Sequence, residues 1–195
     1  MIEAVDESLR TLVARDAVGA SGAEISFDAP TTEWAARRNS PVVDLYLYDI
    51  REDLERRDVA WEPHRDEERR VTHRGPPPRR FALSYLITAW TKRPEDEHRL
   101  LSSMLSCFLP LEALPEDVLQ GELAAARHPL LLRIAMPPKE ERAISDLWTA
   151  LGGELKPSLD LVVTVPFETA RTSPAGPPVL EELHVDMAGL ARRDA

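Results

Sequence analysis

The chain has 195 residues, which fits one domain of ordinary size with a substantial core. Its formal net charge of −10 excludes a general nucleic-acid-binding role, because neutralising phosphates requires a basic face. The single cysteine excludes a disulfide within the chain and does not indicate an oxidising compartment. The first residues lack the basic and apolar regions of a signal peptide, and no run approaches the ~20 apolar residues of a membrane span. We therefore expect a cytoplasmic protein with no nucleic-acid or membrane partner.

The N-terminal part predicts a helix followed by two strands. Apolar residues recur at helical spacing from Ile2 to about Arg15, which predicts an amphipathic helix. Residues 23–27 predict a short strand, residues 28–40 a loop rich in turn formers, and residues 42–56 a long strand. In this long strand aliphatic residues alternate with polar and aromatic ones, so we expect one face to meet the core and the other to be amphipathic. The alternating residues are Val43, Leu45 and Leu47 against Asp44, Tyr46 and Tyr48.

The middle of the chain predicts a charged arm and a hairpin. Residues 53–66 are charged at most positions, which is typical of an arm that leaves the core. Residues 69–74 and 79–91 predict two strands. Gly75-Pro76-Pro77-Pro78 lies between them, and we expect it to form the stiff tip of a hairpin that joins the two strands.

The C-terminal part predicts two helices and two strands. Pro94 followed by three acidic residues predicts the start of a helix, which Pro110 ends. Residues 115–120 predict a short helix, 130–135 a strand, 138–151 a helix with Ile144, Leu147, Trp148 and Leu151 inward, and 159–167 a buried strand. Residues 172–178 predict a linker, 180–185 a last strand, and the end from Asp186 a mobile tail.

This order of elements predicts an α+β fold, a two-layer domain with a mixed or antiparallel sheet and helices packed on one face. We place the domain at residues 1–170 and a Pro-rich linker and C-terminal tail at residues 171–195.

Motifs that would carry chemistry are absent from the sequence. No Gly-rich phosphate loop and no Gly-x-Ser-x-Gly turn occurs. The histidines are too scattered for a metal site on one helix face, and Cys107 lies between Met104 and Phe108 as a small hydrophobe would. We therefore predict no catalytic residue, no cofactor and no metal.

Seven charged residues are candidates for a subunit interface, because they lie in dense runs of mixed sign: Arg51, Glu52, Asp53, Arg56, Arg57, Arg69 and Arg70. Such a run can be a solvated edge guarded against aggregation. It can also select a neighbouring subunit, because electrostatic complementarity sets specificity more than affinity. The residues alone leave both interpretations open.

Three segments of the first 57 residues carry a family resemblance. Val5-Asp6-Glu7-Ser8-Leu9 lies in the first helix, Ile25-Ser26-Phe27-Asp28-Ala29-Pro30 ends the short strand, and Leu45-Tyr46-Leu47-Tyr48-Asp49-Ile50-Arg51-Glu52 forms the long strand. Tyr85-Leu86-Ile87-Thr88-Ala89-Trp90 and the acidic helix start give further, looser support. Together these segments resemble the N-terminal domain of the tail-terminator, or cap, proteins of phage-tail-like contractile injection systems.

The resemblance implies a phage tail-terminator-like fold and a structural role without turnover. It implies a homo-oligomer, a hexameric ring that ends the inner tube and contacts the last sheath layer, assembled in the cytoplasm. It also implies that a set of signature residues serves strand pairing and packing, namely Phe27, Asp28, Tyr46, Tyr48 and Asp49. With the resemblance, the interface interpretation of the charged runs is favoured over the solvated edge. The alternative is a small cytoplasmic enzyme or an adaptor domain with an unrecognised site.

Overall fold

The computed structural model describes residues 1–19, 21–126, 128–137, 144–168 and 171–176. The chain divides into two compact units. The main unit comprises Met1–Arg57 and Arg79–Phe167, and the small unit comprises Asp58–Pro78 and the described residues from Glu168 onward.

The main unit is built on a five-stranded sheet with the strand order β1-β2-β5-β7-β6. Its strands are β1 (Glu24–Ser26), β2 (Val42–Glu52), β5 (Arg79–Trp90), β6 (Leu131–Ile134) and β7 (Ser158–Phe167). The pair β1–β2 is parallel and the other pairs are antiparallel, so the sheet is mixed. The β2–β5 register shifts between Leu47 and Asp49, which marks a bulge at Tyr48.

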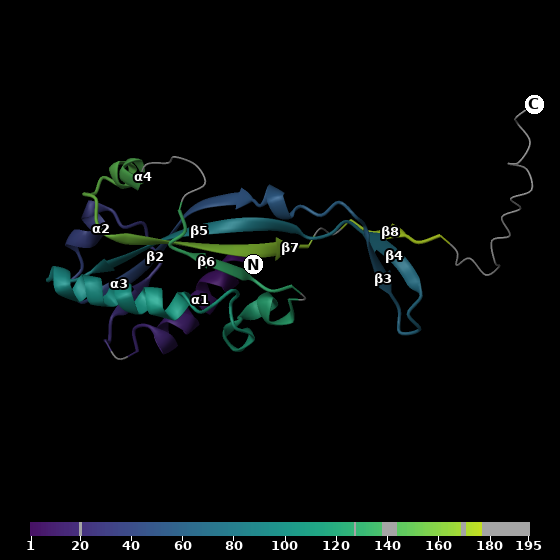
Figure 1. The fold of residues 1–195 in the computed structure, drawn as a ribbon, viewed down its shortest axis with the longest axis horizontal. Coiled ribbons are helices and arrows are strands. Elements are labelled where there is room, and N and C mark those ends of the chain that lie inside the picture. The colour runs from purple at the N-terminus through teal and green to yellow at the C-terminus, as the bar shows by residue number, and fades with distance from the viewer. Residues whose placement is uncertain (20, 127, 138–143, 169–170, 177–195) are drawn as a thin grey trace, which may run out of the picture. The chain divides into compact units, whose positions relative to one another are not determined.

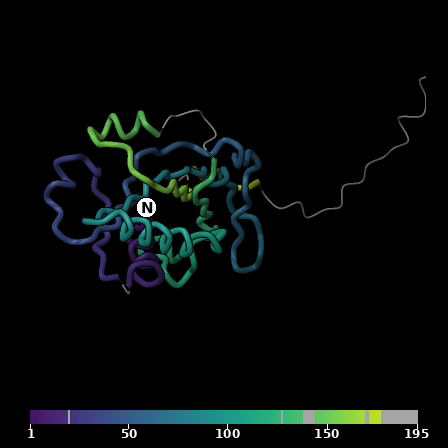
Figure 2. Tube along the Cα trace, turned by 60° about the vertical axis from the view of Figure 1, so that its left-hand side comes forward, coloured from purple at the N-terminus to yellow at the C-terminus, as the bar shows by residue number. Residues whose placement is uncertain are grey.

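One face of this sheet is covered by α1 (Ile2–Asp16) and α3 (Pro94–Phe108), which lie side by side (Figures 1 and 2). Pro94 and the acidic residues after it begin α3 as predicted, because they suit the positive end of the helix dipole. The apolar stripes of both helices meet the inward residues of the central strands. This core includes the fully buried side chains Leu9, Leu12, Leu45, Leu83, Tyr85, Ile87, Met104 and Phe108.

The other face carries two short helices, α2 (Thr32–Ala36) and α4 (Ile144–Ala150) (Figure 1). Trp90 of β5 points to this face, because its neighbour Ala89 belongs to the core under α1 and α3. Trp34 of α2 and Trp148 of α4 both pack on Trp90, with ring centroids 5.6 and 6.3 Å apart. The predicted fold class, an α+β domain with a mixed sheet and packed helices, is confirmed. The prediction places helices on one face only, whereas α2 and α4 also pack on the opposite face through Trp34, Trp90 and Trp148.

The small unit contains a three-stranded sheet of β3 (Glu62–Arg65), β4 (Val71–Gly75) and β8 (Ser173–Pro174). Residues 66–70 turn the chain between β3 and β4, and the carboxylate of Asp66 accepts a 2.8 Å hydrogen bond from the backbone N–H of Arg70. Arg69 takes a positive φ of 64° in this turn. Every residue of β3 is exposed, so the β3–β4 hairpin is a solvated arm within its unit.

The predicted hairpin between residues 69–74 and 79–91 is wrong. β4 pairs with β3 and β8, whereas β5 pairs with β2 and β7 in the other sheet. Residues 75–78 therefore connect two units of the chain and are not a hairpin tip. The physical reason is burial: β5 is buried along most of its length and needs apolar strands on both sides, which the exposed β4 cannot supply.

Smaller corrections concern element boundaries. The long strand ends at Glu52, and a 3₁₀ helix (Leu54–Arg56) follows it. The predicted loop of residues 28–40 contains α2, which Thr31 caps by accepting the N–H of Trp34. β8 lies inside the predicted linker. Ile144 is 46% exposed and does not point inward, although Trp148 does. The predicted strand at 180–185 and the tail from Asp186 lie outside the described residues, and the domain boundary at residue 170 stays a prediction.

Candidate assembly surface

Five of the seven candidate interface residues lie at the C-terminal end of β2 and in the turn that follows it. They are Arg51, Glu52, Asp53, Arg56 and Arg57. Glu52 lies at the centre: its carboxylate accepts hydrogen bonds from Nε of Arg79, at 2.8 Å, and from Nη2 of the same side chain. Nε of Arg57 lies 3.8 Å from the same carboxylate. The Arg79 guanidinium holds the pKa of Glu52 below its ordinary range, because it stabilises the charged form. Glu52 is therefore anionic throughout the neutral range.

Asp53 is the internal member of this group, since it is 9% exposed. Its backbone N–H donates to the carbonyl of Arg80 on β5, and its carboxylate pairs with Arg56 at 3.3 Å. Arg51 pairs with Asp49 at 2.9 Å. Asp53 thus serves to end β2 and to hold the 3₁₀ turn. The arginines around it are about half-exposed and pair with acidic side chains of the same region.

Two apolar side chains lie among these charges, and the charge pattern of the sequence did not reveal them. Ile50 is 48% exposed and Leu54 is 65% exposed. Ile50 pairs with Leu83 across the ladder, so it extends the core face of the sheet. The exposure of Leu54 could have been expected from the sequence, since Leu54 is the only aliphatic residue in the charged run between Asp53 and Asp58. Exposed aliphatic residues ringed by charges are typical of the centre of a protein interface.

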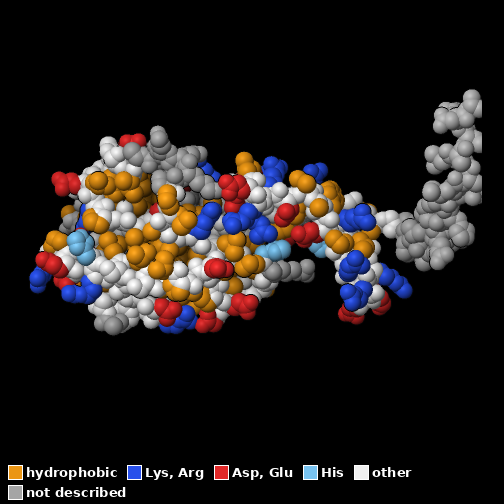
Figure 3. Space-filling view, in the orientation of Figure 1, with side chains coloured by type: hydrophobic (Ala, Val, Ile, Leu, Met, Phe, Trp, Pro, Cys, Tyr) orange, Lys and Arg blue, Asp and Glu red, His pale blue; other side chains and the backbone are white. Residues whose placement is uncertain are grey.

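Arg69 and Arg70, the other two candidates, belong to the small unit. They lie in the turn of the β3–β4 hairpin, where Figure 3 shows side chains of both charges gathered. Neither Arg69 nor Arg70 forms an ion pair with any residue that the structure describes. The same unit exposes Val59 (84%) and Trp61 (53%). Charged and apolar exposed side chains therefore occur together in each unit separately.

The signature residues of the resemblance make internal contacts. The hydroxyl of Tyr48 donates a 2.7 Å hydrogen bond to Asp160 on β7. Burial raises the pKa of the Tyr48 hydroxyl and of the Asp160 carboxyl, because desolvation disfavours the charged form of each group. The rings of Phe27 and Tyr85 pack in a T-shaped arrangement, with their centroids 6.4 Å apart. Tyr46 pairs with Leu86 in the β2–β5 ladder. Roles in strand pairing and packing fit these contacts.

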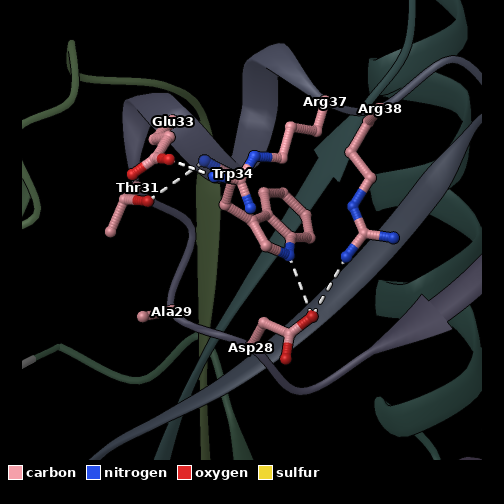
Figure 4. Close-up of a pocket in the computed structure, with 7 residues that line it drawn as sticks. All are labelled: Asp28, Ala29, Thr31, Glu33, Trp34, Arg37 and Arg38. Carbon is pink, nitrogen blue, oxygen red and sulfur yellow. Dashed lines mark hydrogen bonds and ion pairs between the residues drawn. The ribbon is translucent and has the colours of Figure 1, made fainter.

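Asp28 organises a hollow of about 590 Å³ in front of α2 (Figure 4). One of its oxygens, Oδ2, accepts hydrogen bonds from Nε1 of Trp34 at 2.9 Å, from Nη2 of Arg38 at 3.0 Å and from the hydroxyl of Ser26 at 3.0 Å. The indole N–H of Trp34 contributes most to lowering the pKa of Asp28 below its ordinary value. The hollow carries side chains of both charges and favours neither a cationic nor an anionic ligand.

No group of three or more potential metal ligands occurs among the described residues. Burial raises the pKa of Cys107 to about 11, so its thiol is protonated and unreactive at neutral pH. No described helix is long and apolar enough to cross a membrane.

A family model described as the Pvc16 N-terminal domain matches residues 4–182. The chain belongs to this family. The match runs through both units, so the charged end of β2 and the β3–β4 hairpin are parts of the family domain. The resemblance to cap proteins seen in the first strands is confirmed.

Two solved structures share the fold of this Pvc16-type domain. The first is the sheath/tube terminator of an extracellular contractile injection system, PVC, in the extended state, with a TM-score of 0.69 and 20% identity over 98% of this chain. The second is the tube-terminating cap of the anti-feeding prophage, with a TM-score of 0.65 and 21% identity over 95% of this chain. This chain spans 65% and 61% of the length of those proteins. No curated protein matches the sequence.

Proposed function

We propose that this chain is a structural cap subunit of a contractile injection system, which forms a hexameric ring that ends the inner tube and contacts the last sheath layer. The observation that carries the proposal is the family match over residues 4–182. The fold shared with a sheath/tube terminator and a tube-terminating cap supports it. The role is assembly in the cytoplasm without turnover, and its partners are copies of the chain, the tube and the sheath.

The candidate interface residues are suited to such a ring. A closed ring needs a heterologous contact, in which one surface of each subunit meets a different surface of the next. The end of β2 offers the exposed Ile50 and Leu54 for burial, and the arginines around Glu52 and Asp53 for selecting the neighbour. The hairpin turn offers Arg69 and Arg70, two cations without an ion-pair partner among the described residues.

Electron microscopy of the purified chain, alone and mixed with inner tubes, tests the proposal. We expect rings, or density at tube ends that is absent without the chain. A protein that stays monomeric at high concentration and also fails to bind tube ends in a pull-down contradicts the cap function. A molar mass of six chains, measured by static light scattering, checks the number of subunits in the ring separately.

A further inference from the structure

Strand pairing in the small unit brings together two of the histidines that lie scattered in the sequence. His64 lies on β3 and His73 on β4, and the antiparallel register places them directly opposite each other. The register is regular from Glu62 to His64, and the bulge in this pair of strands lies beyond it. Residues directly opposite in an antiparallel pair point to the same face, with their Cβ atoms about 4.5–5.5 Å apart. The two imidazoles therefore share one face of the hairpin.

The side chain of His64 leans across the hairpin onto β4. Gly75 lies on the same face of β4 as His73, because residues two positions apart in a strand point to the same side. Gly75 is buried, and a Cβ atom at this position would lie 3.0 Å from Nε2 and 3.7 Å from Cδ2 of His64. The ring of His64 thus occupies the space left by the missing side chain of Gly75, on the strand that carries His73.

The backbone at both histidines is held in place, while their side chains are open to solvent. β4 is the central strand of the small sheet, so His73 pairs with His64 on one side and with Pro174 of β8 on the other. The hydroxyl of Thr72 donates a 3.3 Å hydrogen bond to the backbone carbonyl of His64. Both histidines are exposed, and β3 and β4 run side by side (Figure 1). A solute therefore reaches both rings without any rearrangement of the hairpin.

The chemistry of this face suits a transition-metal cation. Neutral imidazole is a good ligand for zinc, copper and nickel ions, whereas magnesium and calcium prefer oxygen ligands. Glu62 lies two positions before His64 on β3 and therefore adds a negative charge to the same face. Arg65 and Arg74, which follow the two histidines in sequence, alternate to the opposite face. A cation between the imidazoles is thus spared the nearest arginines of both strands.

We propose that His64 and His73 form a binding site for a divalent transition-metal ion of the zinc type, to which each strand of the β3–β4 hairpin supplies one imidazole. No group of three potential ligands occurs in the described part of the chain, so the other coordination positions are open to water. The bound ion joins β3 to β4. It stabilises the paired hairpin, because only the paired register brings both ligands together. The site lies within the small unit and does not depend on the proposed ring.

Calorimetric titration of the full chain with zinc chloride, after a chelator has removed bound metal, tests the site. His64→Ala and His73→Ala should each lower the zinc affinity by about tenfold or more, because losing a ligand costs at least as much as losing its supporting partner. His98→Ala is the matched control, since His98 is exposed on α3, and it should bind zinc as wild type does. Zinc binding that is equally strong in all three variants overturns the proposal, as does a wild-type dissociation constant weaker than about 1 mM.

Hydrogen exchange of residues 62–75 in the wild-type chain shows whether the ion joins the two strands. At a free zinc concentration about tenfold above the dissociation constant, protection of these amides should rise about tenfold, because zinc binds the paired hairpin and not the separated strands. The exchange of α3 should not respond to zinc, and His73→Ala should show no rise in residues 62–75. Zinc binding that leaves the protection of residues 62–75 unchanged contradicts a site shared by β3 and β4.

Discussion

The hydroxyl of Tyr48 and the carboxylate of Asp160 lie 2.7 Å apart and join β2 to β7 across the intervening strand β5. Tyr48 occupies the bulge in β2, which aims its side chain across the sheet. A residue of the family signature thus closes a non-local contact between segments more than a hundred positions apart.

Replacing Tyr48 with Phe should destabilise the fold by about 1–2 kcal/mol, because it leaves the partly buried carboxylate of Asp160 without this donor. Urea unfolding followed by circular dichroism measures the loss. Tyr46→Phe is the matched control, since the hydroxyl of Tyr46 has no hydrogen-bond partner in the described part of the chain. Equal losses in both variants would show that the Tyr48 hydroxyl contributes nothing specific.

Replacing Asp44 with Asn should change how stability depends on pH. The folded state holds the Asp44 proton up to about pH 7, whereas the unfolded chain releases it near the ordinary value of 3.8. Wild type therefore loses stability as pH rises from about 4 to about 7, and the loss is complete above that range. The variant should lack this contribution, so its free energy of unfolding relative to wild type should improve by about 2–4 kcal/mol between pH 4.5 and pH 8.

The comparison between the two proteins isolates Asp44 from other groups. Burial also raises the pKa of Asp6 and Asp160, and these carboxyls add a slope of the same sign in both proteins. Parallel pH profiles of wild type and variant, measured by urea unfolding in matched buffers, would contradict the assignment.

Reversing the charges of Arg69 and Arg70 to Glu should leave folding intact and prevent ring formation. Neither guanidinium has an ion-pair partner among the described residues, so each substitution should alter stability by no more than about 0.5 kcal/mol. In a ring every copy of the interface carries the penalty, so small costs multiply. Lys92→Glu is the control on another exposed part of the chain.

The same reversal at the end of β2 needs care, because Arg56 pairs with the buried carboxylate of Asp53. Arg57→Glu alone is the cleaner variant there, since its contact with Glu52 is the longer one, at 3.8 Å. Rings or capped tubes that form normally from both sets of variants, judged by electron microscopy at low and moderate salt, would return these residues to the status of a solvated edge.

Cys107 should contribute to the stability of the fold and react slowly with thiol reagents. Its side chain is 9% exposed in the core between the helices and the sheet, so Cys107→Ala should cost about 1 kcal/mol and leave assembly unchanged. Because burial raises the thiol pKa to about 11, the native protein should react with a thiol reagent far more slowly than the unfolded chain. Loss of rings at an unchanged melting temperature would contradict a purely structural role.

The sequence by itself determined the main elements and the family. The helical spacing after Ile2, the proline and acidic residues that begin α3, and the apolar run in β7 each specify their structure locally. The three segments between Val5 and Glu52, taken together, indicated the family. The charged candidates around Glu52 were also visible, because charge is read directly from residue identity.

The tertiary structure alone decided strand partners and the environment of single side chains. Residues 69–74 and 79–91 both predict strands, and the short connection between them favours pairing the two. In the structure β5 is instead flanked by β2 and β7, because a strand buried on both faces needs apolar neighbours. Alternation placed Asp44 on an amphipathic face, and burial there follows from contacts made by distant segments. Pairing and burial depend on what the rest of the chain brings to a position, which local periodicity does not encode.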